Sequence, residues 1–365
     1  MKVLVNALPL RYGGGVTHVE QQLRAVARVA PEVELHTLVS PWTQIRELPG
    51  TVETVPLSSV PQRYLYEQLR LPRRGADVLY CPANFGPVVP TRAPMVLTIH
   101  NAHYYRSGLA MPETRSLRPA WKVKANHLAM KRADTVVAVS QVLAEDAAVT
   151  VPGVAGKVHV IPCGSPEWPA SPVPVGDLPE RYILTLASPA AHKRVIDVVT
   201  GWARSLDRGG GPVGLVVVGE LTEQQRSEHR AAAGRHAQHL FHLGQIGDRA
   251  ELRWLYENAL AMVSMSILES LALTPIEAGS LGCPVVLTDI PAHREATQGH
   301  GAFVPTGDTA ALATALAAGY GRWKPGSEPW DWETTWDDHA RALLEVFETA
   351  RRGSRAATSR PVGAG

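Results

Sequence analysis

The sequence predicts an α/β protein built from two doubly wound, Rossmann-like domains. Short β-rich runs alternate with helix-like stretches along the whole chain, which is typical of this class. Runs such as residues 215–218 are apolar on both faces, as in a parallel sheet covered by helices. The length of 365 residues also exceeds what one hydrophobic core usually serves.

The predicted strands fall into two sets of six, with helical stretches between them. The N-terminal set comprises residues 2–7, 33–39, 77–82, 95–100, 135–140 and 158–162. The C-terminal set comprises residues 182–188, 214–219, 240–244, 260–265, 283–288 and 301–305.

A proline-rich segment separates the two sets. Residues 165–179 contain five prolines, which exclude a helix or a central strand. The predicted organisation is therefore an N-terminal domain over 1–165, a linker over 166–180 and a C-terminal domain over 181–335. Helical periodicity over 338–350 predicts a last helix at 336–350. The small, polar and basic stretch 351–365 is expected to have little order.

Composition excludes several classes of protein. A net charge of +2 gives no strong field for nucleic acid. Cys81, Cys163 and Cys283 are odd in number and widely spaced, which favours reduced thiols. No apolar run reaches the roughly 18 residues of a membrane span, and the N-terminus does not resemble a signal peptide. We therefore expect a cytoplasmic protein, with peripheral contact at the inner membrane face left open.

The most informative strip is 264–286, in which Glu269 and Glu277 lie eight positions apart. It predicts a strand, a loop carrying Glu269, a short helix carrying Glu277 in its first turn, and a second strand. Thr274 is expected as N-cap, Pro275 as the first helical residue and Gly282 as the stop. Two carboxylates beside an anion-attracting helix start suit a sugar nucleotide. Two alternatives stay open: a capping box in which Glu277 reaches back to Thr274, and a solvated Glu269.

Three further features follow predicted strands. Lys193, on the loop after strand 182–188, could neutralise a diphosphate or be a solvated lysine. His100 could face a crevice at the sheet edge, or be a buried or capping histidine. The glycines at 13–15 precede a predicted helix at 17–30 and could approach a phosphate, or form a plain turn. The dinucleotide pattern GxGxxG is not met, because His18 stands at its last glycine.

A series of blocks resembles the retaining glycosyltransferases of family 4 (glycosyl transferases group 1), in the order typical of that family. The resemblance covers about residues 1–350 and implies a GT-B fold, in which two Rossmann-like domains face a central cleft. The N-terminal domain would hold the acceptor and the C-terminal domain a nucleotide sugar, with the last helix crossing back to the N-terminal domain. The blocks are 2–6 with 13–16, 96–100, 133–140, 158–162, 186–193, 264–286 with Glu295, and 303–308.

The resemblance also implies roles for individual residues. Glu269 would position the donor sugar, Glu277 would bind the ribose hydroxyls, Lys193 would hold the diphosphate, and His100 would lie near the transferred sugar. The implied catalytic residues are Glu269, Lys193 and His100. The implied donor-binding residues are Gly14, Gly15, Ser188, Lys193, Arg194, Glu269, Ser270, Leu271, Ala272, Leu273, Thr274 and Glu277. The implied acceptor-side residues are Gly13, His100 and Asn101.

The chain departs from the family pattern at several positions. Many relatives carry an arginine where Ser188 stands, so one positive charge is absent or is supplied by Arg194. Asn101 replaces a common aspartate. Between the two glutamates the chain has Ser-Leu-Ala-Leu-Thr (270–274) in place of Gly-Phe-Gly-Leu-Pro. Any positive φ at Ser270 or Ala272 would be strained.

Two other clusters have competing interpretations. His100 with His103, and His236, His239 and His242, lack a fixed partner carboxylate or cysteine, so surface histidines are favoured over a metal site. The resemblance implies that no metal is required. The stretch 106–132 carries seven basic residues and one acid. A solvated helix face is favoured there, over contact with an anionic membrane through Trp121 or with an anionic acceptor.

The function expected from the sequence is glycosyl transfer from a nucleotide-sugar donor to a small-molecule or glycolipid acceptor, with retained anomeric configuration. The alternatives are a nucleotide-sugar 2-epimerase of the same fold, and a non-catalytic protein that binds sugar nucleotides. The epimerase would act without an acceptor. The binding protein would show affinity without turnover.

Overall fold

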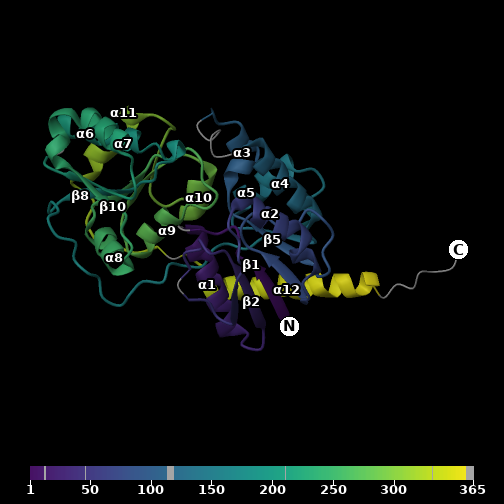
Figure 1. Cartoon of the computed structure of the whole chain (residues 1–365). Helices are drawn as coiled ribbons and strands as arrows, with labels where there is room; N and C mark the ends of the chain where they lie inside the picture. The colour runs from purple at the N-terminus through teal and green to yellow at the C-terminus, as the bar shows by residue number, and fades with distance from the viewer. Residues whose placement is uncertain (12–13, 46, 113–118, 210, 331, 359–365) are drawn as a thin grey trace. The chain divides into compact units, whose positions relative to one another are not determined.

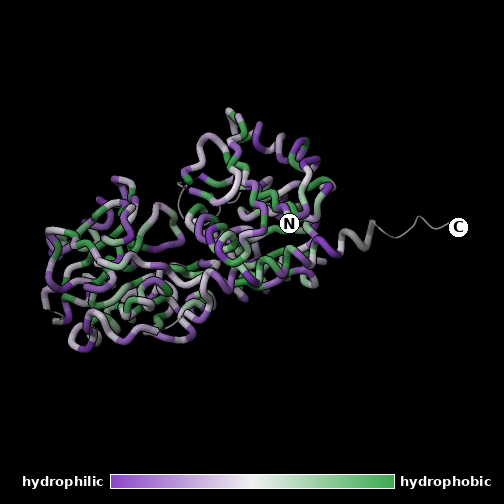
Figure 2. The backbone as a smooth tube through the Cα atoms, turned by 90° about the horizontal axis from the view of Figure 1, so that it is seen from below, coloured by the Kyte–Doolittle hydropathy of each residue, from purple (hydrophilic) through white to green (hydrophobic). Residues whose placement is uncertain are grey.

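The structure, a computed structural model, describes residues 1–11, 14–45, 47–112, 119–209, 211–330 and 332–358. The chain divides into two compact units, each built on one parallel sheet. Unit 1 comprises Met1–Gly164 and the segment from Thr334 onward, and unit 2 comprises Ser165–Glu333. Hydrophobic stretches gather inside each unit and hydrophilic ones lie along its outside (Figure 2).

Unit 1 contains a seven-stranded sheet in the order β3-β2-β1-β4-β5-β6-β7, with every neighbouring pair parallel. The strands are β1 (Lys2–Asn6), β2 (Glu34–Val39), β3 (Thr51–Thr54), β4 (Val78–Cys81), β5 (Met95–Ile99), β6 (Thr135–Ala138) and β7 (Val158–Val160). The helices are α1 (Gly14–Val29), α2 (Val60–Leu69), α3 (Arg106–Leu109), α4 (Ala120–Arg132), α5 (Gln141–Thr150) and α12 (Trp336–Thr358).

Unit 2 contains a six-stranded sheet in the order β10-β9-β8-β11-β12-β13, also parallel throughout. The strands are β8 (Tyr182–Leu186), β9 (Gly214–Val218), β10 (Leu240–Gly244), β11 (Ala261–Ser264), β12 (Val285–Thr288) and β13 (Ala302–Val304). The helices are α6 (Val195–Asp207), α7 (Glu223–Ala233), α8 (Arg249–Asn258), α9 (Leu273–Ser280), α10 (Pro291–Thr297) and α11 (Thr309–Gly319). Short 3-10 turns are η1 (Leu71–Arg73), η2 (Ala102–Tyr104), η4 (Ala155–Lys157), η5 (Ala191–Lys193) and η6 (Gly234–His239).

Both sheets follow the doubly wound pattern that the sequence predicts. All twelve predicted strands are present. The inner strands are buried apolar runs between helices, whereas β7, β10 and β13 at the sheet edges are only partly buried. The prediction missed β3, whose four residues are almost all exposed at the sheet edge and form no apolar run. In each sheet the order reverses beside the first strand, between β1 and β4 and between β8 and β11. Such switch points are where ligands bind in open α/β sheets.

The long helix α12 belongs to unit 1, where it lies beside α1 (Figure 1) and packs against β4 and β5 of the sheet. Arg28 on α1 donates from Nε to Asp337 Oδ1 at 2.8 Å. Trp336 packs on Gly164 so closely that a Cβ at Gly164 would lie 2.5 Å from the Trp336 nitrogen. The helix continues to Thr358, so the prediction of a helix ending at 350 and an unordered tail from 351 is wrong for 351–358.

The segment 166–180, which the sequence predicts to be a linker, makes specific contacts within unit 2. It clusters with unit 2, and the unit boundaries fall at Gly164/Ser165 and Glu333/Thr334. The Trp168 indole donates to Ser280 Oγ at 3.0 Å, and the Val173 amide donates to the Ala250 carbonyl at 3.0 Å. Prolines exclude regular structure in this segment, but Trp168, Val175 and Leu178 are partly buried against the hydrophobic core of unit 2.

Gly282 ends α9, as the sequence predicts, and only glycine fits there. Its φ is +67°, and a Cβ would lie 1.9 Å from the Ser327 carbonyl oxygen. We expect Gly282→Ala to destabilise unit 2 by at least about 2 kcal/mol and to lower its Tm by roughly 5 °C or more. Calorimetry measures this. Gly247→Ala is the matched control, because no atom lies within 4 Å of its Cβ position. Equal Tm values for the two variants would contradict the steric argument.

Candidate functional site

Two loops meet at the switch point of unit 2. One follows β8 and contains η5, and the other follows β11 and carries Glu269. The Ile267 amide donates to the His192 carbonyl at 2.9 Å, and the Ser266 hydroxyl donates to the same oxygen at 3.3 Å. Because β8 and β11 are neighbours in the sheet, these bonds fix both loops at its carboxyl edge.

Lys193 and Glu269 form an ion pair at this edge. Lys193 Nζ lies 2.7 Å from Glu269 Oε1, and the two side chains are 28% and 15% exposed. Burial raises the pKa of Glu269. The charge and hydrogen bond of Lys193, with a smaller contribution from His293, lower this pKa by more than burial raises it, so the net shift is downward. Glu269 is therefore ionised at neutral pH and can only accept hydrogen bonds.

The second glutamate, Glu277, is held from α8. Arg249 Nη1 lies 3.2 Å from Glu277 Oε1, and the Tyr256 hydroxyl donates to Oε2 at 3.1 Å. Burial raises the pKa of Glu277, and the charge of Arg249 opposes that shift. The Arg249 guanidinium lies 4.2 Å from the centre of the Trp168 ring. Glu277 is thus an oriented carboxyl group with fixed partners.

The expected cap of α9 is wrong. The helix begins at Leu273 with Ala272 as N-cap and no side-chain capping bond, so Pro275 is its third residue. Thr274 lies inside the helix, and the capping-box alternative fails because the Glu277 oxygens bond to Arg249 and Tyr256. Burial of Leu271 and Ala272 in the preceding loop sets the start of the helix more strongly than the Thr-Pro signal does.

The altered strip between the glutamates adopts an ordinary backbone. Positive φ values at non-glycine residues occur at Asn84, Asp177, Arg194 and Gln298 among the described residues, and not at Ser270 or Ala272. Ala272 has φ −76° and ψ 88°. The lost glycines therefore introduce no left-handed strain. Leu271 and Ala272 are buried, and Leu273 is exposed.

Ser188 and Arg194 flank Lys193 but have other partners. The Ser188 hydroxyl accepts from the Ala190 amide at 3.4 Å. The Arg194 guanidinium binds Asp197 through two bonds of 2.7 and 3.2 Å. Its φ of +49° places it in the left-handed region at the N-cap of α6. The positive charge of Arg194 is thus compensated by Asp197 where it stands.

Sequence reasoning missed three residues of this region: His293, Arg249 and Tyr256. His293 is fully buried on α10, donates from Nδ1 to the Thr288 carbonyl at 2.8 Å, and acts electrostatically on Glu269. The rule that found His100, a polar side chain just after a buried strand, could also have found His293 after strand 283–288. Arg249 and Tyr256 lie on a helix and follow no motif.

In unit 1, His100 lies at the carboxyl edge of the sheet, directly after β5. Asn84 follows β4 with φ +62°; its Oδ1 accepts from the His100 amide at 2.8 Å, and its Nδ2 lies 3.0 Å from His100 Nε2. With Oδ1 fixed as an acceptor, Nδ2 must donate to Nε2, so the ring proton is on Nδ1. Burial lowers the pKa of His100 to about 4, so the ring is neutral.

The glycine segment lies next to His100. Helix α1 begins at Gly14, so Gly14 and Gly15 form its first turn and do not precede a helix starting at 17. A Cβ at Gly15 would lie 3.6 Å from His100 Nε2. Gly13 lies outside the described residues. Asn101 accepts from the His103 amide at 3.0 Å and caps η2, so its side chain already has a structural role.

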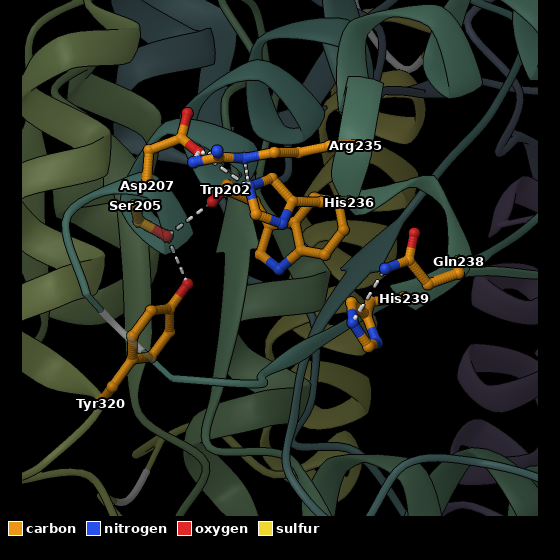
Figure 3. Close-up of polar contacts among 8 residues, drawn as sticks. All are labelled: Trp202, Ser205, Asp207, Arg235, His236, Gln238, His239 and Tyr320. Atoms are coloured by element: carbon orange, nitrogen blue, oxygen red, sulfur yellow. Dashed lines mark hydrogen bonds and ion pairs between the residues drawn. The ribbon is translucent and has the colours of Figure 1, made fainter.

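The side chains of His236, His239 and His242 do not converge on one point. Figure 3 shows His236 directed at Asp207, 2.8 Å between Nε2 and Oδ1, and His239 beside Gln238. His242 instead pairs with His229 at 3.3 Å. Within the described ranges, no group of three histidine, cysteine, aspartate or glutamate side chains is arranged to hold a metal ion.

The basic stretch is only partly within the described ranges, since Glu113, Arg115 and Arg118 lie outside them. Trp121 on α4 is 51% exposed, with Lys122 Nζ 5.6 Å from its ring centre. Within the described chain, no helix combines the length and apolar character needed to span a bilayer.

Comparisons with known proteins agree with this architecture. The protein-family model described as Glycosyltransferase Family 4 matches residues 12–166 of the sequence. A second family model, described as Glycosyl transferases group 1, matches residues 172–318. Together the two matches cover most of both units. The chain belongs to the GT-B glycosyltransferases.

Individual relatives agree with this family. A phosphatidyl-myo-inositol mannosyltransferase of Mycobacterium leprae (strain TN) is 36% identical over 117 residues, which is 29% of this chain and 28% of the length of that relative. A sucrose-phosphate synthase from Thermosynechococcus elongatus has a TM-score of 0.65 at 19% identity, with 98% of each chain covered. The glycosyltransferase WaaG has a TM-score of 0.65 at 16% identity, with 98% of this chain and 100% of WaaG covered. The Anabaena protein HepE, solved with UDP and glucose, has a TM-score of 0.60 at 16% identity, with 98% of this chain and 99% of HepE covered. The solved structures share the GT-B fold with this chain.

Proposed function

We propose that this protein transfers a sugar from a nucleotide-sugar donor to an acceptor hydroxyl with retention of anomeric configuration. The Lys193–Glu269 ion pair at the switch point of unit 2 is the observation that carries the proposal. It places one cation and one hydrogen-bond acceptor where open α/β sheets bind their ligands. Family membership and the UDP and glucose bound to the structurally similar HepE support a sugar nucleotide as the ligand.

In this proposal each member of the pair contacts a different part of the donor. Lys193 would hold the diphosphate, whose negative charge grows as the glycosidic bond breaks, together with the N-terminus of α6. Ionised Glu269 would accept hydrogen bonds from sugar hydroxyls. Glu277, oriented by Arg249 and Tyr256, would bind the ribose hydroxyls. These contacts supply the charge stabilisation without a metal ion.

Retention follows in the proposal from a front-face step. The diphosphate leaves from one face of the sugar, an oxocarbenium-like centre develops, and the acceptor oxygen attacks on the same face. The departing phosphate oxygen can take the acceptor proton, so the step needs no nucleophile from the protein. The neutral His100 and the first turn of α1 would lie on the acceptor side. Positioning and electrostatics would provide the rate enhancement.

The test is a panel of UDP, GDP, ADP and TDP sugars. We expect one donor class to raise the Tm, and mass spectrometry to find a transferred sugar when an acceptor mixture is added. The anomeric configuration of the product is read by NMR. An isomerised nucleotide sugar formed without acceptor would indicate an epimerase. Donor binding with no product from any acceptor would indicate a binding protein, and an inverted product would overturn retention.

A further inference from the structure

A cavity of about 400 Å³ opens at the carboxyl edge of the unit 1 sheet. Its floor is formed by the segments that follow β1, β4 and β5, including Asn84 and His100, and its sides come from α2, α4 and the segment after β2. The volume is at the lower end of the roughly 300–1,000 Å³ of small-molecule sites, which suits a ligand of one ring. The cavity lies at the β1/β4 switch point.

Aromatic side chains line much of this cavity. Trp42, Tyr64 and Phe85 are all partly buried, so each can still present ring surface. Tyr64 is fixed from both sides, because its ring centre lies 5.1 Å from that of Trp121 and 6.5 Å from that of Phe85. Rigid aromatic faces of this kind pack against the apolar face of a sugar or polyol ring.

Three cations also line the cavity, and no acidic residue is among its described lining. Arg63 is almost fully buried and lies 3.8 Å from the equally buried Glu67, so its charge is largely compensated. Arg11, 5.7 Å from the Trp42 ring centre, and Lys122 have no acidic partner among the described residues. An anionic ligand in this cavity would therefore meet two uncompensated positive charges.

The floor supplies neutral polar groups. The neutral imidazole of His100 is held by Asn84, which adopts a left-handed conformation that asparagine tolerates better than most residues. Strained backbone of this kind is retained where the surroundings require it, often at binding sites. Neutral hydrogen-bonding groups at the floor suit hydroxyls, whereas the cations at the sides suit an anion.

We propose that this cavity is the acceptor site and that it selects an anionic sugar or polyol, bearing a phosphate or carboxylate. The proposal rests on the transferase function proposed above. The ring lies on the aromatic side chains with its hydroxyls toward the floor, and Arg11 and Lys122 bind the anion. Either a free sugar phosphate or the headgroup of an anionic lipid carries this chemistry.

Matched acceptor pairs test the proposal. With the donor found in the panel, glucose 6-phosphate is compared with glucose, glucuronate with glucose, and phosphatidylglycerol vesicles with phosphatidylcholine vesicles. We expect at least one anionic member to exceed its neutral counterpart about tenfold or more in kcat/KM or in calorimetric affinity, less so at high salt. A preference for the soluble anion would identify a free anionic sugar as the acceptor. A preference for the anionic vesicles would identify a lipid headgroup as the acceptor.

Variants connect the preference to the cavity. Arg11→Gln and Lys122→Gln should each reduce kcat/KM for the anionic acceptor about tenfold, with the neutral acceptor and the donor KM changed less than about twofold. Arg70→Gln, an exposed arginine of unit 1 outside the cavity, is the control and should leave the preference intact. Tm measurements check that each variant is folded.

The outcomes separate this inference from the proposed function. Donor binding and transfer that are equally efficient with charged and neutral acceptors would overturn the inference and leave the transferase function standing. A preference for anions that persists in both variants would also overturn it. No transfer from any donor would count against the function, while calorimetric binding of glucose 6-phosphate that is lost in Arg11→Gln would still support the cavity as an anion site.

Discussion

Lys193→Ala is expected to lower kcat/KM for glycosyl transfer by about 10²–10³-fold, because it removes the cation that would stabilise the leaving diphosphate. The donor KM should rise as well. Stability should fall far less, by about 1–2 kcal/mol, since both partners of the ion pair are partly exposed. Glu269 would respond by taking up a proton more readily, which limits the cost of losing its counter-charge.

Lys324→Ala is the matched control for this prediction. Lys324 is an exposed lysine of the same unit, so its removal should change neither transfer nor Tm. Lys193→Arg keeps the charge and should recover part of the lost activity. A Lys193→Ala enzyme that transfers at the wild-type rate, or one whose activity loss is matched by an equivalent loss of folded protein, would show that Lys193 is a structural residue.

Strand positions could be predicted because apolar runs carry the information locally. Residues 215–218 are apolar on both faces, which is typical of a strand inside a parallel sheet that is covered by helices. β3 shows the limit, since its exposed residues carry no hydrophobic pattern. The last helix shows another: charged and small residues after 350 gave no local signal for its continuation to Thr358.

The candidate site was predictable as separate pieces, but its contacts were not. Lys193 and Glu269 belong to different motifs, and their 2.7 Å contact depends on β8 and β11 being neighbours in the sheet. That adjacency is a property of the doubly wound topology and is not encoded in either motif. The partners of Glu277 were harder still, because Arg249 and Tyr256 reach it from a different helix through tertiary packing.

A second large effect is expected on acidification, through a hydrogen-bonded chain inside unit 1. His339 on α12 donates from Nδ1 to the Pro162 carbonyl at 2.6 Å, and its Nε2 lies 2.7 Å from Gln22 Nε2. Gln22 Oε1 already accepts from the Tyr80 hydroxyl at 2.7 Å, so the amide nitrogen of Gln22 must donate to His339. A protonated His339 would place its new N–H against that donor.

The sign of the pH dependence follows from the neutral state of His339. Burial lowers its pKa to about 4, against an unfolded value of about 6.5. The unfolded chain therefore binds a proton that the folded chain does not, and stability falls as pH drops through this window. His339 alone accounts for roughly 3 kcal/mol between pH 6.5 and 4. Burial also lowers the pKa values of His18 and His100, so they act in the same direction.

His339→Gln isolates this contribution. The variant should be less stable than the wild type at pH 7.5, because glutamine cannot reproduce both bonds of the ring, but its Tm should depend less on pH between 6.5 and 4. His159→Gln, at an exposed position on β7, should keep the wild-type profile. Thermal unfolding across this range measures both. Parallel curves of Tm against pH for the wild type and His339→Gln would contradict the prediction. They would mean that the hydrogen bonds from Tyr80 through Gln22 to Pro162 do not keep the His339 imidazole neutral.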